Sequence, residues 1–600
     1  MSASPAAAWR TRARAARVGL LAALACAVLA SGAAFAADPA RTLRIAQFDL
    51  DTLDPHQYTD DPSFQVVQAL FEPAYEWDYL AKVPTLAPLT AAALPEVTDE
   101  GRVWIVRLQR GILFHDDPVF KGKPRELTAD DYVYAYKRWL DPNGRRGGSP
   151  ILTGLIVGAR EVVDAARKDG RFDFDRPIEG LRSIDRYTLR IALREPNYPN
   201  VRELLSFVGA LPREVVDDAK GDIRTRPVGT GPYRLKEWKR GSRVVLVAHP
   251  GYREAGFPAS RDPADASLVA AMKGKRVPFA GTVEISIVDE DITRLLLFEK
   301  GDIDFVQLRG EIATRLTAGD SKLKPEYAAR GIARHVFVEP FLFSTYFNLK
   351  DPVIGGMGND RVALRRAVAM SWDADTAIKV VLAGGAIPAG QLIPPGVAGH
   401  DPALPAKSIY DPGTANALLD RVGYGKRDRA GFRLAPDGSP LMLTVMLRTG
   451  GASREFQMLW KRSLEAIGVR GDFKLAPFQE VIKDLENGKY QMYQGGFGGA
   501  PSGYNIFAQL HSVQPQRVNV SQFANADYDR AAEAFLRAAG ERDELTASRR
   551  MNEIARALMP QMPAYFRLET IYTQPWLIGY RPMVFSSYWK YLDVDLARRK

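Results

Sequence analysis

The stretch that decides the fold reads Pro227-Val228-Gly229-Thr230-Gly231-Pro232-Tyr233-Arg234-Leu235-Lys236-Glu237-Trp238. Two prolines and two glycines fit neither a helix nor a central strand, so Pro227–Pro232 is predicted to be a constrained turn. A strand begins at Tyr233 and is broken by residues 239–242. The apolar run within Arg243–His249 is predicted to be its antiparallel partner. The residues alone therefore predict a rigid turn that leads into a β-hairpin.

The first 36 residues have the pattern of a cleavable export signal. Arginines at positions 10, 12, 14 and 17 precede the apolar run Val18–Ala30, and Ala34-Phe35-Ala36 offers small residues for cleavage after Ala36. An uncleaved anchor is the alternative, but the run is shorter than the roughly 20 residues that a membrane-spanning helix needs. Cys26, the only cysteine, offers lipid attachment as a second alternative, although Ala23-Leu24-Ala25 is a poor motif for it.

Composition and charge narrow the class of function. The 600 residues are 46% hydrophobic, which is enough for more than one core. Cleavage after Ala36 lowers the formal net charge from +10 to +6 and leaves a chain without cysteine, so no disulfide is expected. No basic run with interleaved aromatics indicates nucleic acid. Beyond the export signal no apolar stretch approaches about 18 residues, which predicts a soluble mature protein.

Strand and helix patterns continue along the rest of the chain. Arg41–Phe48 is predicted to be a strand, Ile184–Leu193 another, and Gly251–Lys275 a surface loop. After Glu339, strands and helices alternate as an α/β lobe requires. Pro563–Tyr580 then returns as extended chain.

Five motifs occur in the order in which the extracellular solute-binding proteins of family 5 carry them. They are Leu53-Asp54-Pro55, Arg110–Asp117, Leu127–Val133, Pro227–Trp238 and Gly301–Phe305. By these motifs the chain resembles the oligopeptide- and dipeptide-binding components of ABC importers. The resemblance covers about residues 41–592.

The resemblance implies an α/β, two-lobed periplasmic binding protein of type II, in the large (cluster C) form with an extra subdomain in the first lobe. The implied division is 1–36 signal peptide, 37–85 first part of lobe 1, 86–178 inserted subdomain, 179–338 second part of lobe 1, 339–565 lobe 2 and 566–600 return to lobe 1. A monomer that closes about a hinge around its ligand is expected.

A ligand is predicted to bind beyond the end of the strand Tyr490–Phe497. That strand runs into Gly498-Gly499-Ala500-Pro501-Ser502-Gly503-Tyr504-Asn505, whose glycines let backbone groups approach a ligand closely. A flexible surface loop is the alternative. The resemblance supports the first interpretation, because it implies ligand contacts from the aromatic at the strand end and the polar loop after it. The predicted ligand-binding residues are Leu53, Asp54, Tyr346, Gln494, Phe497, Gly498, Gly499, Ala500 and Tyr504.

Two positions depart from the pattern that the resemblance implies for peptide binders. Ala500 stands where those proteins hold the peptide's α-ammonium with an aspartate, and Gln494 stands where a basic residue sometimes occurs. A buried ammonium without an ionic partner would cost on the order of several kcal/mol. We therefore expect a neutral or blocked ligand, or an anchor supplied elsewhere, for which Asp54 and Asp49 are candidates. Tyr346, Phe497 and Tyr504 could stack on a ligand, with core packing as the alternative.

No motif for catalysis is found. The six histidines are scattered, and the sequence has no nucleophile elbow, zinc-protease motif or phosphate loop. We expect no enzyme, no metal and no cofactor. The expected partners are an oligopeptide or similar solute and an inner-membrane ABC permease with its ATPase subunits. Alternatives are a non-peptide ligand (an oligosaccharide, opine or metal chelate) on the same fold and, more remotely, a secreted enzyme.

Overall fold

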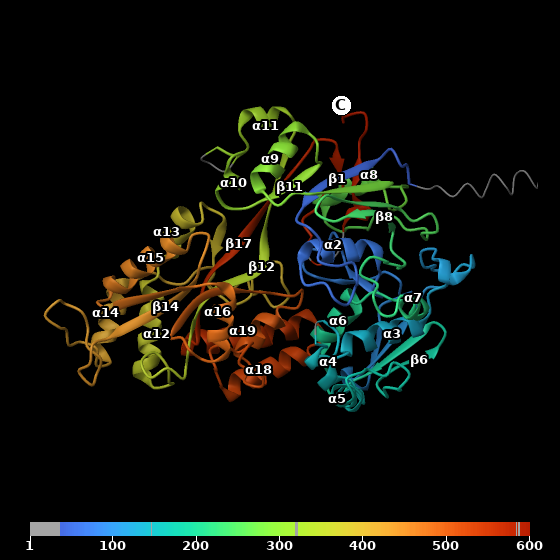
Figure 1. The fold of residues 1–600 in the computed structure, drawn as a ribbon. Helices are drawn as coiled ribbons and strands as arrows, with labels where there is room; N and C mark the ends of the chain where they lie inside the picture. The colour runs from blue at the N-terminus through green and yellow to red at the C-terminus, as the bar shows by residue number, and fades with distance from the viewer. Residues whose placement is uncertain (1–36, 146, 319–321, 584, 586–587, 600) are drawn as a thin grey trace, which may run out of the picture.

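A computed structural model describes residues 37–599 apart from 146, 319–321, 584 and 586–587 (Figure 1). The predicted export signal, with Cys26, lies outside the described residues. Over the described ranges, no helix combines the length and the apolarity needed to cross a membrane. Two bodies are visible, blue to green on the right and yellow to orange on the left, with strands running between them.

A four-stranded hairpin sheet, in the order β1-β10-β9-β8, confirms the predicted strands. Its members are β1 (Thr42–Gln47), β8 (Tyr233–Lys239), β9 (Arg243–Ala248) and β10 (Thr282–Ile287). β8 and β9 pair antiparallel as the predicted hairpin, and β1 pairs with β10 in parallel.

A second four-stranded sheet, the inserted sheet, has the order β4-β5-β7-β6. Its members are β4 (Glu96–Thr98), β5 (Val103–Arg107), β6 (Leu181–Asp185) and β7 (Thr188–Ala192). The single strand predicted for 184–193 is wrong, because the Asp185 carboxylate accepts a hydrogen bond from the Tyr187 amide and turns the chain. Since β6 and β7 pair here, the inserted sheet extends past residue 178.

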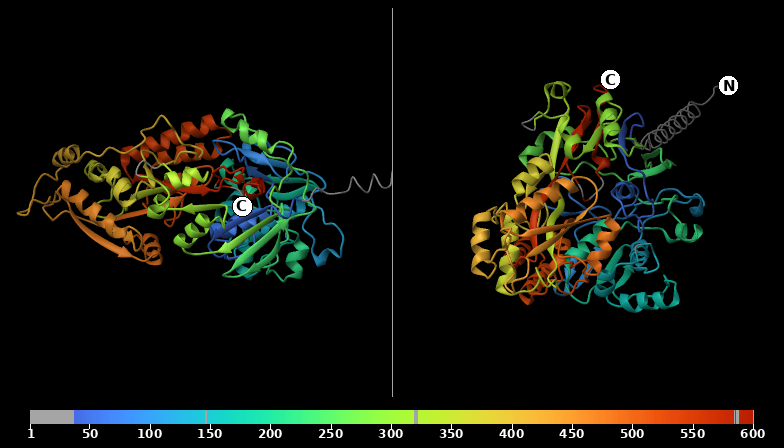
Figure 2. Two further views of the ribbon diagram at one scale, coloured as in Figure 1. Left: turned by 90° about the horizontal axis from the view of Figure 1, so that it is seen from above. Right: turned by 60° about the vertical axis from the view of Figure 1, so that its left-hand side comes forward.

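The seven-stranded large sheet, in the order β11-β17-β12-β16-β14-β15 with β13 beside β17, runs from one body into the other. Its members are β11 (Phe305–Leu308), β12 (Ala333–Phe347), β13 (Ala386–Pro388), β14 (Met442–Arg448), β15 (Arg470–Ala476), β16 (Met492–Gly498) and β17 (Gln561–Thr573). The two longest strands, β12 and β17, pair antiparallel and connect the bodies, which Figure 2 shows from two further sides. Both lobe boundaries predicted near residues 339 and 565 fall inside these strands.

We use "first lobe" for the body with the hairpin and inserted sheets, and "second lobe" for the body with β13–β16. The first lobe also holds two short strand pairs: β2 (Tyr75–Trp77) with β3 (Leu86–Pro88), and β18 (Leu577–Ile578) with β19 (Asp593–Val594). Its helices are α2 (Asp61–Leu70), α3 (Ala129–Leu140), α4 (Pro150–Leu155), α5 (Ala159–Asp169), α6 (Tyr198–Phe207), α7 (Arg213–Asp218) and α8 (Ala266–Met272). α8 lies within residues 251–275, which were predicted to be loop throughout.

Three helices pack near β11: α9 (Asp291–Lys300), α10 (Gly310–Thr314) and α11 (Pro325–Ala329). The helices of the second lobe are α12 (Asn359–Ser371), α13 (Ala374–Thr376), α14 (Pro412–Arg421), α15 (Ser453–Ala466), α16 (Phe478–Glu486), α17 (Tyr504–Phe507), α18 (Ala526–Arg537) and α19 (Glu541–Leu558). One core fills the first lobe, and separate clusters around Trp460 and Tyr346 lie in the second.

The turn at residues 227–232 is held by backbone contacts with the end of α2. The Gly231 amide donates to the Leu70 carbonyl at 2.9 Å. A Cβ on Gly229 would lie 2.0 Å from the Leu70 oxygen, and one on Gly231 would lie 2.5 Å from the Ala69 oxygen. The glycines are therefore required by close approach rather than by an unusual φ. This places the signature stretch in the scaffold of the first lobe.

Candidate ligand-binding site

The glycine-rich segment after β16 lies where the second lobe meets the first. β16 pairs antiparallel with β12, from Met492 opposite Phe347 to Gly498 opposite Phe341. The Gly499 amide then donates to the Pro340 carbonyl at 2.6 Å. Three residues further on, the Ser502 hydroxyl donates to the Glu203 carboxylate at 3.2 Å, and Glu203 belongs to α6 of the first lobe. We call residues 498–503 the junction loop. It begins at the end of β16, beside the connecting strand β12, and its far end contacts the first lobe.

The three predicted aromatics have different positions. Tyr346 is fully buried, and its hydroxyl donates to Gln509 at 2.8 Å. Tyr504 is also buried, with its hydroxyl 3.0 Å from a ring nitrogen of His511. Phe497 is only partly buried and meets the edge of Tyr346 at 5.4 Å between ring centroids. Of the three, Phe497 alone keeps a surface that a ligand could cover.

The neighbouring predicted positions divide in the same way. Gln494 is buried, and its side-chain oxygen accepts a hydrogen bond from the Trp460 indole at 2.9 Å. Gln494 therefore faces the core of the second lobe. Gly498 is exposed, Gly499 is partly exposed and Ala500 is 8% exposed. The structure thus brings Phe497, Gly498 and Gly499 together at one surface, whereas residues 500–503 of the junction loop are buried.

Leu53 and Asp54 lie elsewhere in the first lobe. Both are fully buried, and the Asp54 carboxylate is paired with the Arg138 guanidinium at 3.0 and 3.2 Å. Asp49, the other candidate anchor, is exposed and accepts a hydrogen bond from the Gly241 amide at 3.0 Å. In the described part of the chain, no hydrogen bond or ion pair joins Asp54 or Asp49 to the junction loop.

A group of charged side chains that the sequence reasoning missed lies on the connecting strands and at the end of β11, which pairs with β17. Arg309 donates to Glu569 at 2.5 Å, and Arg567 donates to Glu339 at 2.8 Å. A weaker contact of 3.6 Å joins Arg309 to Glu339, so the four side chains form one network. The Arg567 guanidinium also lies over the ring of Phe341, 5.3 Å from its centroid. We call Arg309, Glu339, Arg567 and Glu569 the strand network.

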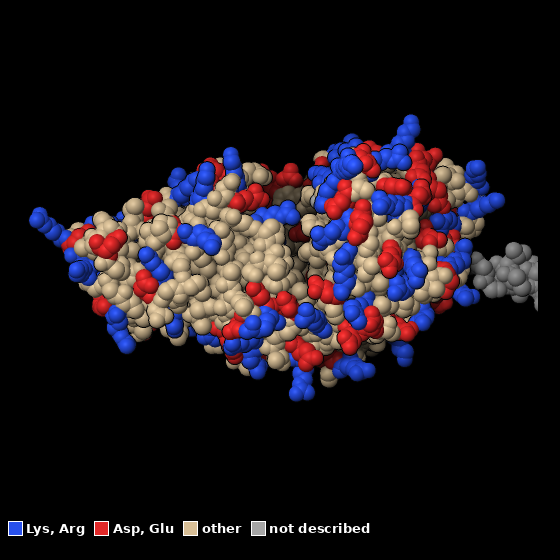
Figure 3. All heavy atoms as spheres, turned by 90° about the horizontal axis from the view of Figure 1, so that it is seen from below, with Lys and Arg blue, Asp and Glu red and all other residues tan. Residues whose placement is uncertain are grey.

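Asp61, at the start of α2, places a charged side chain of the first lobe close to the strand network. Burial by the surrounding protein raises the pKa of Asp61, and the charge of Arg309 opposes that rise. The same side chain is nevertheless exposed to solvent. Both observations hold for a group that lines a recess, where water is present but limited. Figure 3 shows such a hollow between the lobes, with Lys, Arg, Asp and Glu side chains at its edge.

One sequence signal could have identified the strand network. Glu339 lies in Val336-Phe337-Val338-Glu339-Pro340-Phe341, and Arg567 and Glu569 lie in a similar apolar run. Charged residues are rarely buried unless they are paired, so a charge inside a long apolar strand calls for a partner. Tertiary structure decides which strands pair. The partners of these charged residues could therefore not be predicted from the sequence.

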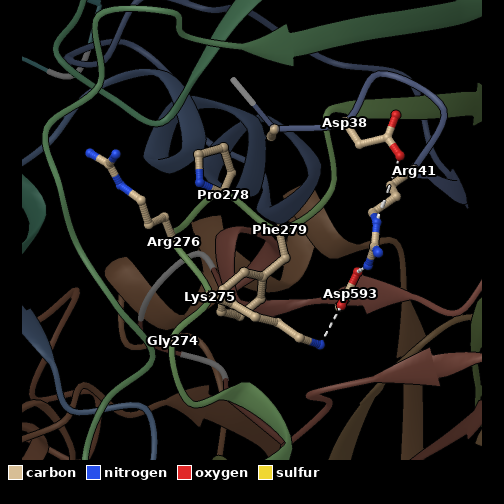
Figure 4. A pocket seen from close by; sticks show the side chains of 9 residues that line it. Asp38, Arg41, Gly274, Lys275, Arg276, Pro278, Phe279 and Asp593 are labelled. Carbon is tan, nitrogen blue, oxygen red and sulfur yellow. Dashed lines mark hydrogen bonds and ion pairs between the residues drawn. The ribbon is translucent and has the colours of Figure 1, made fainter. Parts of the chain in front are cut away.

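A cavity of about 350 Å³ lies apart from this junction, in the first lobe (Figure 4). Its lining includes Arg41, Lys275 and Asp593. Asp593 accepts from Arg41 at 2.6 Å and from Lys275 at 2.7 Å, so its charge is already balanced. The predicted site shares no lining residue with this cavity, and we assign the cavity no ligand.

Comparison with known proteins agrees with this architecture. Residues 85–516 match the bacterial extracellular solute-binding proteins, family 5. The chain belongs to this family. Family 5 is a family of binding proteins, so the expectation of no enzymatic activity is confirmed. The expected mixed α/β fold of cluster C is also confirmed.

Proteins similar to this chain are named for different ligands. The chain is 25% identical to di/tripeptide-binding protein 2 of Pseudomonas aeruginosa, over 77% of each chain. It is 22% identical to heme-binding protein A of Haemophilus influenzae, over 72% of this chain and 70% of that protein. The unliganded open form of the periplasmic murein tripeptide-binding protein MppA matches with a TM-score of 0.69 and 20% identity, covering 92% of this chain and 97% of that one.

No metal site was predicted, and the described residues contain no group of three or more His, Cys, Asp or Glu placed to hold an ion. The two histidines that do lie together are His115 and His249, with ring centroids 4.8 Å apart. His115 is hydrogen-bonded to Gly229 and Gly231 of the signature turn, at 3.3 and 3.1 Å. Both rings therefore belong to the packing of the first lobe.

Proposed function

We propose that this protein is the periplasmic substrate-binding component of an ABC importer. It captures an oligopeptide or a solute of similar size between its lobes and delivers it to an inner-membrane permease. The main support is the junction loop, which follows β16 of the second lobe and reaches the first lobe through the Ser502–Glu203 contact of 3.2 Å. Ligands of open α/β proteins bind beyond the carboxyl ends of strands, and β16 ends at this loop.

The proposed mechanism is hinge closure about β12 and β17. These two strands carry three members of the strand network, Glu339, Arg567 and Glu569. Contacts between α6 and the second lobe, such as Arg202 with Glu544 at 2.6 Å, are made by other elements. A ligand that touches both lobes binds the closed state better than the open one and therefore shifts the population toward closure. The closed form then docks on the permease.

Measurement of bound solute tests this function. The full mature protein, purified from periplasmic extract without added ligand, is expected to retain a stoichiometric solute that mass spectrometry identifies. Deletion of the gene should abolish uptake of that solute by whole cells, and a plasmid copy should restore it. Turnover of the solute, or uptake unchanged by the deletion, would contradict the proposal.

A non-peptide ligand is the second candidate. It is supported by Ala500 and Gln494 at positions where the resemblance implies charge, and by a relative that is named for heme binding. A thermal-shift screen of peptides, oligosaccharides, opines and metal chelates separates the two candidates. Stabilisation by a member of one class alone identifies that class, because a ligand present at about 100 times its Kd adds about 2.7 kcal/mol to the free energy of unfolding.

The proposed location requires export with cleavage after Ala36. N-terminal sequencing of protein from the periplasmic fraction should begin at Ala37. A membrane-bound product that begins at Cys26 and carries lipid would instead support the lipoprotein alternative.

A further inference from the structure

Helix α6 presents two charged side chains to the second lobe, and they differ in their partners. Its buried face, with Val201, Leu204 and Leu205, packs into the first lobe. Arg202 reaches across to Glu544 at 2.6 Å and to the Ala539 carbonyl at 2.7 Å. The adjacent Glu203 accepts a hydrogen bond from Ser502 at 3.2 Å.

Arg202 has an oppositely charged partner in Glu544, whereas Glu203 has none among the described residues. Among the described residues, no lysine, arginine or histidine forms an ion pair with Glu203. Its side chain is partly accessible to solvent, but burial nevertheless raises its pKa to about 7, and only the Ser502 hydrogen bond opposes that rise. Its partial exposure and its contact with Ser502 of the second lobe place it in a recess where the two lobes meet. A desolvated carboxylate is strongly favoured to pair with a cation that can enter the recess.

The opposite wall of this recess carries no charge of its own. Residues 498–504 are Gly-Gly-Ala-Pro-Ser-Gly-Tyr. Backbone at Gly498 and Gly499 is accessible, and Ser502 already touches Glu203. A ligand placed here would meet neutral backbone from the second lobe and one carboxylate from the first.

We propose that Glu203 is the ionic anchor for a primary ammonium of the ligand, held between α6 and the junction loop. This inference rests on the proposed function and specifies its ligand as one with a free amino group, such as a peptide with an unblocked N-terminus. The carboxylate that binds the ammonium is thus supplied from outside the junction loop, and it is neither Asp54 nor Asp49. Because the carboxylate and the loop lie on different lobes, the ammonium would also couple recognition to closure.

The test compares two tetrapeptide libraries, one with free N-termini and one N-acetylated, by mass spectrometry of the peptides that the full mature protein retains after gel filtration. The wild type is compared with Glu203→Gln, which keeps an acceptor for Ser502 but removes the charge. Glu195→Gln is the matched control, because Glu195 is exposed and lies just before α6. Circular dichroism melts confirm that all three proteins are folded.

The wild type and Glu195→Gln are expected to retain the free library at least about tenfold more than the acetylated one, a ratio worth about 1.4 kcal/mol. Glu203→Gln should lose that preference, and Glu203→Asp should keep part of it. Equal retention of the two libraries by the wild type, or an unchanged preference in Glu203→Gln, overturns the anchor while peptide capture stands. If the wild type retains neither library, the anchor and peptide capture both fail.

Discussion

Gly229 has no side chain because a carbonyl oxygen occupies the place where one would be. The Leu70 oxygen would lie 2.0 Å from a Cβ at this position, well inside van der Waals contact. Helix α2 ends there, and its free carbonyls need donors. The Gly231 amide supplies one of them at 2.9 Å. The motif that identifies the family is thus a cap on α2, and the chain cannot add a methyl group without moving the helix or the turn.

Gly229→Ala is therefore expected to lower the free energy of unfolding by about 3 kcal/mol, because the clash is with backbone that cannot rotate away. Urea denaturation followed by circular dichroism measures the loss. Gly256→Ala is the control in the same lobe, where the nearest atom to the new Cβ lies at 4.0 Å. Equal stability of the two variants would show that the turn can relax.

His115 is expected to make the first lobe less stable in acid. The pKa of His115 is lowered to about 3, mainly by burial and to a lesser degree by the neighbouring His249. The positive charge of Arg234 lowers this pKa slightly further. The unfolded chain, with a pKa near 6.5, then binds more protons than the native one, so stability is complete at neutral pH and is lost as pH falls from about 6.5 toward 3. The expected loss from this group is about 3 kcal/mol between pH 7 and pH 4.

Urea midpoints at pH 7, 5 and 4 test this. His115→Asn should be less stable at pH 7, because its hydrogen bonds to the turn change, but its midpoint should fall less steeply with acid than that of the wild type. His400→Gln in the second lobe serves as the control and should keep the wild-type slope. A slope unaltered by His115→Asn would assign the acid sensitivity to other groups.

The strands β12 and β17 connect the two lobes. Within the strand network, Arg567 of β17 pairs with Glu339 of β12 and so joins the two strands. Arg567 contributes twice, through its pair with Glu339 and through its position over Phe341 and Phe343. Its side chain is 30% exposed and that of Glu339 16%, so the pair is only partly screened by water.

Arg567→Met should lower the free energy of unfolding by about 1–2 kcal/mol, between the values for exposed and for buried pairs, because Glu339 keeps only the longer contact to Arg309. Arg167→Met removes an exposed helical pair of 2.9 Å with Asp164 and should change stability by less than about 0.5 kcal/mol. Chemical denaturation of the two variants in parallel provides the comparison. A loss no larger than that of the control would mean that the network adds no stability.

Elements that depend on residues close together in the sequence could be predicted. Features that depend on contacts between distant parts of the chain could not. The hairpin β8–β9 follows from its turn residues. The start of α3 also has a local cause, because the amide and the hydroxyl of Thr128 both donate to the carboxylate of Asp131, three residues on. The place of the junction loop also followed, from the glycines after β16. Glu203 was missed because nothing around it in sequence announces that Ser502, 299 residues away, will lie against it. Tyr346 was selected as an aromatic near the loop, but both faces of β12 are buried at residues 344–347, so its ring lies in the core.

The proposed hinge mechanism requires the lobes to separate for ligand to enter and leave, and a covalent link between the lobes tests this. Arg202 and Glu544 face each other across the junction at 2.6 Å. If cleavage removes Cys26, the mature chain has no other cysteine to interfere. Arg202→Cys combined with Glu544→Cys, joined by a short bismaleimide, should trap a peptide that was bound beforehand and slow its release at least about tenfold, since release then requires opening against a covalent link.

The same double variant, cross-linked before the peptide is added, should not bind it. Each single substitution treated with the reagent should behave as the wild type, apart from the loss of one ion pair. Release from the cross-linked protein at the wild-type rate would show that ligand exchange does not need these surfaces to separate.

The two ends of the described chain are held by the same lobe. Arg41, near the first described residue, donates to Asp593 at 2.6 Å, and Arg599 donates to the Thr42 carbonyl at 2.7 Å. Fluorescent proteins fused to the two termini would therefore travel as one body, and energy transfer between them would not change when the lobes close. A reporter of ligand uptake needs its acceptor in the other lobe, and the exposed turn at residues 449–451, between β14 and α15, is a place where an insertion leaves the large sheet intact.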